Sequence, residues 1–215
     1  SMDLPHPETG ETIPADAGEP ELPWLRAQTV GEHVAAEVLR LLETDGGPDL
    51  DSLRLHVRAK TIFIGLENPV FRIAAKLGRL DRGSFDGRLR TEVSVIDLGP
   101  FRLVGVPGEI YPEIVYGGIE TPPGADFAVE PVEVPPIAEA LAAPGIEQVL
   151  VIGLANDEVG YLIPKSEWDA PILPWDSDGA PPYLYNAEKP PYGEINSCGP
   201  NAAKTVHEAI LSLPK

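Results

Sequence analysis

Three short segments of the chain combine residue types that bind metals or substrates with a local pattern that would display them. The first is Gly105-Val106-Pro107-Gly108-Glu109, which follows an apolar run and ends in a carboxylate. A strand that ends in Pro-Gly presents the next residue at the edge of its sheet, where functional sites are common. Glu109 can therefore serve as a metal ligand, as a general base, or as a charge stabilised by the dipole of a following helix.

The second segment, residues 151–164, is an apolar run that leads into a polar turn at 156–158 and then to Tyr161. These residues also fit an ordinary loop followed by an aromatic side chain at the edge of the core. The third segment, residues 192–201, precedes the last predicted helix and carries a proline near the first position of that helix. It fits either a helix cap or a polar loop that closes over a pocket.

The elements that position these segments follow from hydrophobic periodicity. The period-two pattern over 53–64 predicts a half-buried strand, and the continuous apolar run 149–154 predicts a strand buried on both faces. The turn Gly99-Pro100 favours a hairpin between two further strands. The predicted class is therefore α/β, with a mixed sheet or sheets, flanking helices and long Pro-rich loops. The inward residues of the first strand are expected to be Leu53, Leu55 and Val57; the hairpin strands are expected over 91–98 and 101–106, and helices over 71–80, 109–117, 137–143 and 200–213.

The first 23 residues differ in composition from the rest of the chain. Residues 1–23 are acidic and rich in proline, which predicts an extended lead-in or linker, and residues 24–215 are expected to form the folded part. The first helix is expected to begin near Thr29, because Thr29 and Glu32 have the spacing of a capping box. Its apolar face would contain Val34, Val38, Leu41 and Leu42.

Composition excludes some functions. The net charge of −18 over 215 residues argues against binding to nucleic-acid phosphates, which requires clustered Lys and Arg. No apolar run reaches the roughly 20 residues of a membrane span, and no signal peptide is visible at the start. Ser1-Met2 is typical of an expression-tag remnant, so a targeting signal can have been lost and the compartment is not predicted. The one cysteine, Cys198, excludes an intramolecular disulfide and is expected to be inert.

Taken together, in this order and at this spacing, the three segments resemble the neutral/alkaline (non-lysosomal) ceramidase family, and most closely its bacterial, ceramidase-like branch. The resemblance rests on Val-Pro-Gly-Glu at 106–109, on Gly-Leu-Ala-Asn at 153–156 followed by Tyr161, and on the Tyr-Gly-Glu and Ser-Cys-Gly-Pro motifs within 192–200. It covers the C-terminal part of the family's catalytic domain, from about residue 24 onward.

The resemblance implies a zinc-dependent amidohydrolase that cleaves the N-acyl amide of ceramide-like lipids. The family holds its zinc with two histidines, a glutamate and a tyrosine, and the last two match Glu109 and Tyr161. The substrate pocket would then be lined by Asn156, Tyr192 and Asn196. Members of this family are often secreted.

The chain also departs from the family pattern. The segments that supply the family's two zinc histidines and its catalytic serine have no counterpart here, so no catalytic residue is assigned. The four histidines present are His6, His33, His56 and His207, and we expect them to be solvated or structural. We therefore expect this chain alone to be inactive and to require a missing N-terminal half or a homodimer mate. The third segment is also shorter than in the family, so ceramide is the family substrate rather than an assigned one.

A second hypothesis belongs to another class of function. The Pro-rich segment 164–192 contains two tryptophans and several tyrosines. It would present an aromatic surface to a lipid, a glycan or a partner chain in a non-catalytic binding or structural module. Zinc titration separates the two hypotheses, because only a metal site gives metal-dependent stabilisation.

Overall fold

The computed structural model describes residues 4–5, 9–13, 22–44, 52–80, 84–121, 129–168 and 192–213. The chain divides into two compact units, residues 1–52 and residues 53–215. His6 and residues 169–191 of the aromatic segment lie outside the described residues. No described helix is long and apolar enough to cross a membrane.

The first unit contains a short strand pair and one long helix. Strands β1 (Leu4–Pro5) and β2 (Thr12–Ile13) pair antiparallel, and α1 spans Leu22–Thr44. The prediction that this helix begins near Thr29 is wrong, because Pro23 is tolerated in the first turn and the helix starts before it. The Thr29 hydroxyl does not cap the helix but donates to the Leu25 carbonyl at 2.8 Å inside it. The predicted apolar face is exposed, at 59% for Val34, 50% for Val38, 45% for Leu41 and 65% for Leu42.

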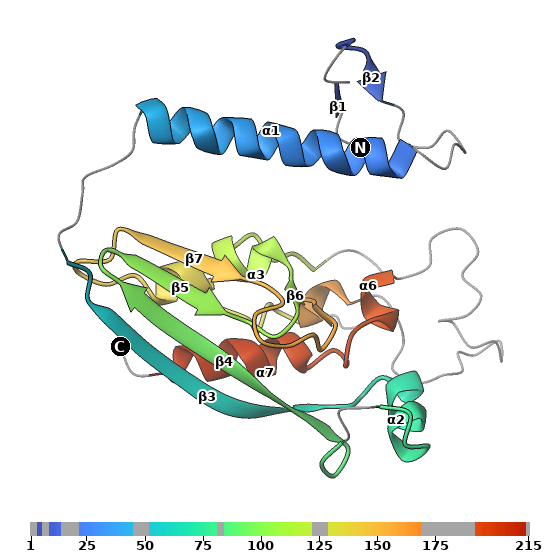
Figure 1. Ribbon diagram of the computed structural model, residues 1–215. Helices are drawn as coiled ribbons and strands as arrows, with labels where there is room; N and C mark the ends of the chain where they lie inside the picture. Colours follow the sequence, from blue (N-terminus) through green and yellow to red (C-terminus); the bar gives the residue numbers. More distant parts are fainter. Residues whose placement is uncertain are drawn as a thin grey trace. The chain divides into compact units, whose positions relative to one another are not determined.

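The second unit is built on a four-stranded mixed sheet with flanking helices, which confirms the α/β class (Figure 1). The strand order is β3-β4-β5-β7; the first two pairings are antiparallel and the last is parallel. The predicted hairpin is confirmed, with its turn at Gly99-Pro100. The strands are β3 (Leu55–Gly65), β4 (Arg88–Leu98), β5 (Phe101–Gly105) and β7 (Gln148–Ile152).

Short elements connect and cover this sheet. The helix expected over 109–117 begins only at Pro112, because Glu109 and Ile110 form strand β6 and pair with β8 (Tyr161–Leu162). The last helix, α7 (Ala202–Leu211), starts just after the predicted position. The others are α2 (Pro69–Lys76), α3 (Pro112–Tyr116), α4 (Ile137–Ala140), the 3-10 turn η1 (Lys165–Glu167) and α6 (Tyr192–Ile195).

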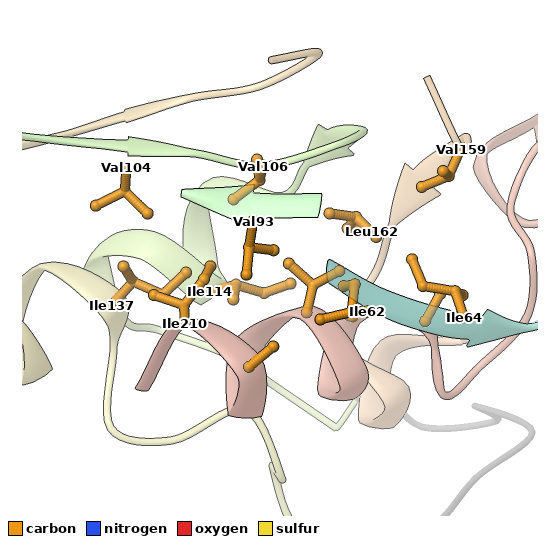
Figure 2. Close-up of a cluster of buried hydrophobic side chains, with 14 of the residues drawn as sticks. Ile62, Ile64, Val93, Val104, Val106, Ile114, Ile137, Val159, Leu162 and Ile210 are labelled. Carbon is orange, nitrogen blue, oxygen red and sulfur yellow. The ribbon is translucent and has the colours of Figure 1, made fainter. Parts of the chain in front are cut away.

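The core lies between the sheet and α7. Ile210 of this helix is 0% exposed and belongs to one cluster with Val93 and Val104 of the sheet. Figure 2 shows that side chains from β3, β4 and β5 converge on this helix and on Ile114 and Ile137 from the crossover after β6. The core therefore lies on one face of the sheet.

The predicted phase of β3 is wrong. Leu53, Leu55 and Val57 are 44%, 65% and 54% exposed, whereas the buried residues of the strand are Ile62 and Ile64. Alternation shows that the two faces differ, but not which face is covered. The same applies to β7, which was expected to be buried on both faces but exposes Leu150 and Ile152 at 37% and 48%.

An ion-pair cluster explains how the polar phase of β3 comes to face inward. Arg58 of β3 and Arg102 of β5 both contact the Asp97 carboxylate of β4, each at 2.6 Å. Arg102 also donates to the Leu141 carbonyl at 2.7 Å. Hydrogen bonding to Arg102, and secondarily to Arg58, lowers the pKa of Asp97 below its ordinary value. The charge of Arg58 is thus neutralised inside the fold, so the face of β3 that carries Arg58 need not point to solvent.

Candidate functional site

The two residues predicted as metal ligands lie opposite each other. Glu109 and Tyr161 are register partners in the parallel pairing of β6 and β8. The Tyr161 phenol donates a hydrogen bond to the Glu109 carboxylate, and this bond, aided by partial burial, raises the pKa of Tyr161 above its ordinary value. Two segments 52 residues apart in sequence therefore deliver a carboxylate and a phenol to the same point.

The backbone fixes this juxtaposition. After β5 the chain turns at Pro107-Gly108, and the Pro107 carbonyl accepts a hydrogen bond from Val159 N–H at 2.8 Å. The Gly108 carbonyl accepts one from Leu154 N–H at 3.1 Å. A Cβ at position 108 would collide with the Gly160 carbonyl, so only glycine permits this approach. The Pro-Gly turn thus positions Glu109 through close backbone contact.

The third segment joins the same point from the other side. Ser197 forms an antiparallel bridge with Gly160, and the Asn196 carbonyl accepts a hydrogen bond from Tyr161 N–H at 3.1 Å. The Asn196 side-chain amide donates to the Tyr192 carbonyl at 2.8 Å, which closes the short helix α6. All three sequence segments therefore meet in one place.

Three tyrosines form an edge-to-face row along this junction. The ring centroid of Tyr161 lies 5.8 Å from that of Tyr192 and 6.5 Å from that of Tyr111. The interplanar angles are 75° and 87°, which are the arrangements that aromatic quadrupoles favour. The row orients the Tyr161 ring while Glu109 orients its hydroxyl.

A cavity of about 360 Å³ opens beside this junction, within the size range of small-molecule sites. Its lining combines polar residues, among them Glu109, Tyr161 and Asn196, with apolar residues, among them Phe71 and Leu89. The full lining is Phe71, Leu80, Leu89, Glu109, Glu158, Val159, Gly160, Tyr161, Tyr192 and Asn196.

Four of the five predicted site residues line this cavity: Glu109, Tyr161, Tyr192 and Asn196. The fifth, Asn156, is exposed in the turn after β7 with φ of 67° and is not among the lining residues. The lining residues that sequence reasoning missed are Phe71, Leu80 and Leu89, whose apolar side chains carry no signal that separates a pocket from a core.

The acids beside Tyr161 shape the turn that carries it. The Glu158 carboxylate accepts a hydrogen bond from Gly160 N–H at 2.7 Å, and Asp157 accepts one from the Thr91 hydroxyl at 2.6 Å. These contacts tie the turn to itself and to β4. Glu158 also lines the cavity and adds a second carboxylate to its rim.

The described histidines lie outside the cavity. His33 and His56 are exposed, and His207 is buried in α7 with its Nε2 2.8 Å from the Pro135 carbonyl. Cys198 is buried, and its Sγ lies 3.1 Å from the Val159 carbonyl. Within the described ranges, no group of three or more His, Cys, Asp or Glu is arranged to hold a metal ion.

The donor types at the junction fit part of a zinc site. Carboxylate oxygen is an ordinary zinc ligand, and the phenol oxygen of Tyr161 is held next to the Glu109 carboxylate. By donor type, these two groups could supply two of the four ligands of a zinc ion.

Little of the aromatic segment 164–192 can be placed on a surface. Trp168 is 2% exposed and packs with Ile163, and Tyr192 contributes to the cavity. The one tryptophan of this segment that the structure describes is therefore buried.

The chain matches no family model, no curated protein and no solved structure.

Proposed function

We propose that this chain supplies the glutamate and tyrosine half of a zinc-dependent amidohydrolase site acting on the N-acyl amide of ceramide-like lipids. The observation that carries the proposal is the pairing of Glu109 with Tyr161 at the rim of a cavity. The resemblance of the three segments to the neutral ceramidases adds support, because those segments meet at this cavity.

In this proposal, zinc is held by a Glu109 carboxylate oxygen and by the Tyr161 phenol oxygen. When bound there, zinc would supply Lewis-acid chemistry toward an amide carbonyl and a water. In the proposal, the remaining ligands come from another polypeptide segment or from a homodimer mate, because within the described ranges no group of three or more His, Cys, Asp or Glu is arranged to hold a metal ion. The isolated chain is therefore a weak metal binder and an inactive enzyme.

Different residues of the cavity lining are proposed to bind different parts of an amide lipid. The hydrogen bond between the Tyr161 phenol and the Glu109 carboxylate keeps the two proposed ligand oxygens next to each other. The apolar wall of Phe71, Leu80 and Leu89 fits the hydrocarbon part of the substrate. Tyr192 and Asn196 also line the cavity.

Zinc titration by calorimetry tests the ligand assignment. The wild-type chain is expected to bind zinc weakly, and E109Q and Y161F are each expected to lose more than about tenfold in affinity, since even outer partners of metal ligands are worth 10–100-fold. E147Q is the matched control, because Glu147 is an exposed carboxylate outside the cavity lining. Equal zinc affinity in all four proteins would reject the assignment.

A second arm tests the incompleteness of the site. Purified chain with added zinc is expected to release no fatty acid from an N-acylsphingosine in micelles. Turnover that persists in the wild type and is lost in E109Q would retain the site but reject the need for a second half.

A further inference from the structure

The wall of the cavity formed by residues 192–198 is attached to α2 through one buried side chain. Asn68 is 5% exposed, and its side-chain oxygen caps α2 by accepting hydrogen bonds from Val70 N–H at 2.9 Å and Phe71 N–H at 3.4 Å. Its side-chain nitrogen donates to the carbonyls of Ile195 at 3.1 Å and Ser197 at 2.9 Å. The amide thus makes two bonds as acceptor and two as donor, which is its full capacity.

The neighbouring residue strengthens the attachment. The backbone N–H groups of Glu67 and Asn68 both donate to the Cys198 carbonyl, at 2.8 Å and 2.9 Å. The Glu67 carboxylate accepts from the backbone N–H of Asn201 at 2.9 Å and from its side-chain amide at 2.6 Å. A Cβ at Gly199 would collide with the Glu67 side chain, so the two segments are in close contact.

The attached wall reaches the centre of the site. Between the two carbonyls that Asn68 holds lies Asn196, whose own carbonyl accepts the Tyr161 N–H. The side-chain oxygen of the same amide caps α2, which carries Phe71 of the cavity lining. One side chain therefore links α2 to the segment that carries Asn196, and both Phe71 and Asn196 line the cavity.

We infer that Asn68 is a positioning residue: its side-chain amide locks the 192–198 wall to α2 and so holds Asn196 and Tyr192 against Tyr161. The inference rests on the cavity used in the proposed function, but its test needs neither metal nor substrate. The simpler role to be separated from it is capping of α2, which uses only the side-chain oxygen.

The substitution N68D separates these two roles. Aspartate is as good a helix cap as asparagine, so the bonds to Val70 and Phe71 are kept. The two donors to the wall are lost, and an oxygen then faces the carbonyls of Ile195 and Ser197. N68A removes both roles and serves as the complete deletion.

The thiol of Cys198 can be used to measure how often the 192–198 wall opens. Cys198 is the one cysteine of the chain, it is 0% exposed, and its carbonyl is held by Glu67 and Asn68. Its rate of reaction with a thiol reagent under native conditions reports how often this wall opens. Loss of two hydrogen bonds is expected to accelerate labelling in N68D by at least about tenfold.

Amide hydrogen exchange gives a readout at the site itself. Tyr161 N–H donates to the wall at Asn196, whereas Tyr111 N–H donates to Leu162 outside it. N68D is therefore expected to lower protection of the Tyr161 amide at least about tenfold and to leave the Tyr111 amide within about twofold.

I210V is the matched control, because Ile210 is fully buried in α7 and its truncation lowers global stability while leaving the side chain of Asn68 unchanged. The inference is overturned if N68D labels Cys198 at the wild-type rate, or if I210V accelerates labelling as much at an equal shift of the unfolding midpoint. It is also overturned if both tyrosine amides lose protection together in N68D. An unchanged zinc affinity in E109Q would reject the proposed function and leave these exchange results intact.

Discussion

Two carboxylates, Asp97 in strand β4 and Glu109 at the rim of the cavity, have opposite kinds of hydrogen-bond partner. Asp97 lies between two arginines whose side chains are 8% and 6% exposed, and their attraction lowers its pKa. Glu109 lies at the exposed rim of the cavity, where its hydrogen-bond partner is the neutral phenol of Tyr161. The first charge is cancelled within the fold and the second remains able to attract a cation. The comparison shows that the partner decides whether an acid serves stability or a site.

Removing the cancelled charge is expected to have the largest effect on stability. D97A leaves two buried guanidinium groups without their counter-ion, which costs about 3–5 kcal/mol of unfolding free energy. Chemical denaturation followed by circular dichroism measures this loss. E208Q, which breaks the exposed Lys204–Glu208 pair, is the control and should change stability by less than about 1 kcal/mol. A D97A loss as small as that of the control would contradict the structural role.

The sign of the pH dependence follows from the lowered pKa. The Asp97 carboxylate contributes its stability above its ordinary pKa of 3.8, and this contribution is lost as the pH falls through the lowered folded-state value. D97A should therefore flatten the acid side of the stability curve. A curve parallel to that of the wild type below pH 4 would place the acid sensitivity elsewhere.

Glu133 sharpens the comparison because it is buried with no arginine paired to it among the described residues. It is 0% exposed, and burial raises its pKa, with its best contact a hydrogen bond from Lys165 N–H at 3.4 Å. Its stabilising contribution is complete below 4.5 and is lost as the pH rises through the raised folded-state value. E133Q removes this penalty and should raise stability at pH 7 by about 1–2 kcal/mol.

Denaturation of wild type and E133Q at pH 4 and at pH 7 checks this expectation. The two proteins should be close in stability at the lower pH, where Glu133 already binds its proton. A variant that is less stable by the same amount at both values would show that the glutamine fails to fit.

The smallest effect on stability is expected at Glu109. Because the side chain is exposed, E109Q should alter the unfolding free energy by less than about 0.5 kcal/mol. It should nevertheless lower the pKa of Tyr161 toward its ordinary value, since the carboxylate that favours the neutral phenol is gone. Ultraviolet titration of wild type, E109Q and Y161F isolates the Tyr161 signal. An unchanged titration in E109Q would show that the two groups are not in contact in solution.

The parts of the fold that sequence predicted are those with a local signal. The hairpin at Gly99-Pro100 follows from the turn residues. The position of Glu109 just beyond the end of β5 follows from the Pro-Gly turn at the end of an apolar run. The phase of β3 could not be predicted, because Arg58 faces inward only by virtue of Asp97, 39 residues away. The sequence predicts too late a start for α1, because Thr29 has the residue pattern of a cap although it lies within the helix.

The site divides in the same way. Glu109, Tyr161, Tyr192 and Asn196 were grouped through the order of three motifs, and their polar or aromatic character made them visible. Phe71 and Leu89 line the cavity but have the pattern of ordinary core residues. The role of Asn68 depends on carbonyls at 195 and 197, so no local pattern reveals it.

The junction of Gly108, Gly160 and Asn196 has a consequence for how this site can diversify. A side chain at either glycine would strike the backbone of the next segment, so the frame of the junction is made of main chain alone. Substitution at positions 108 and 160 should be rejected in a saturation library, whereas position 192, with its side chain 64% exposed, should accept many residues. Because the main chain fixes the junction, selection can change exposed lining residues such as Tyr192, and with them the ligand that the cavity binds, while the fold stays the same.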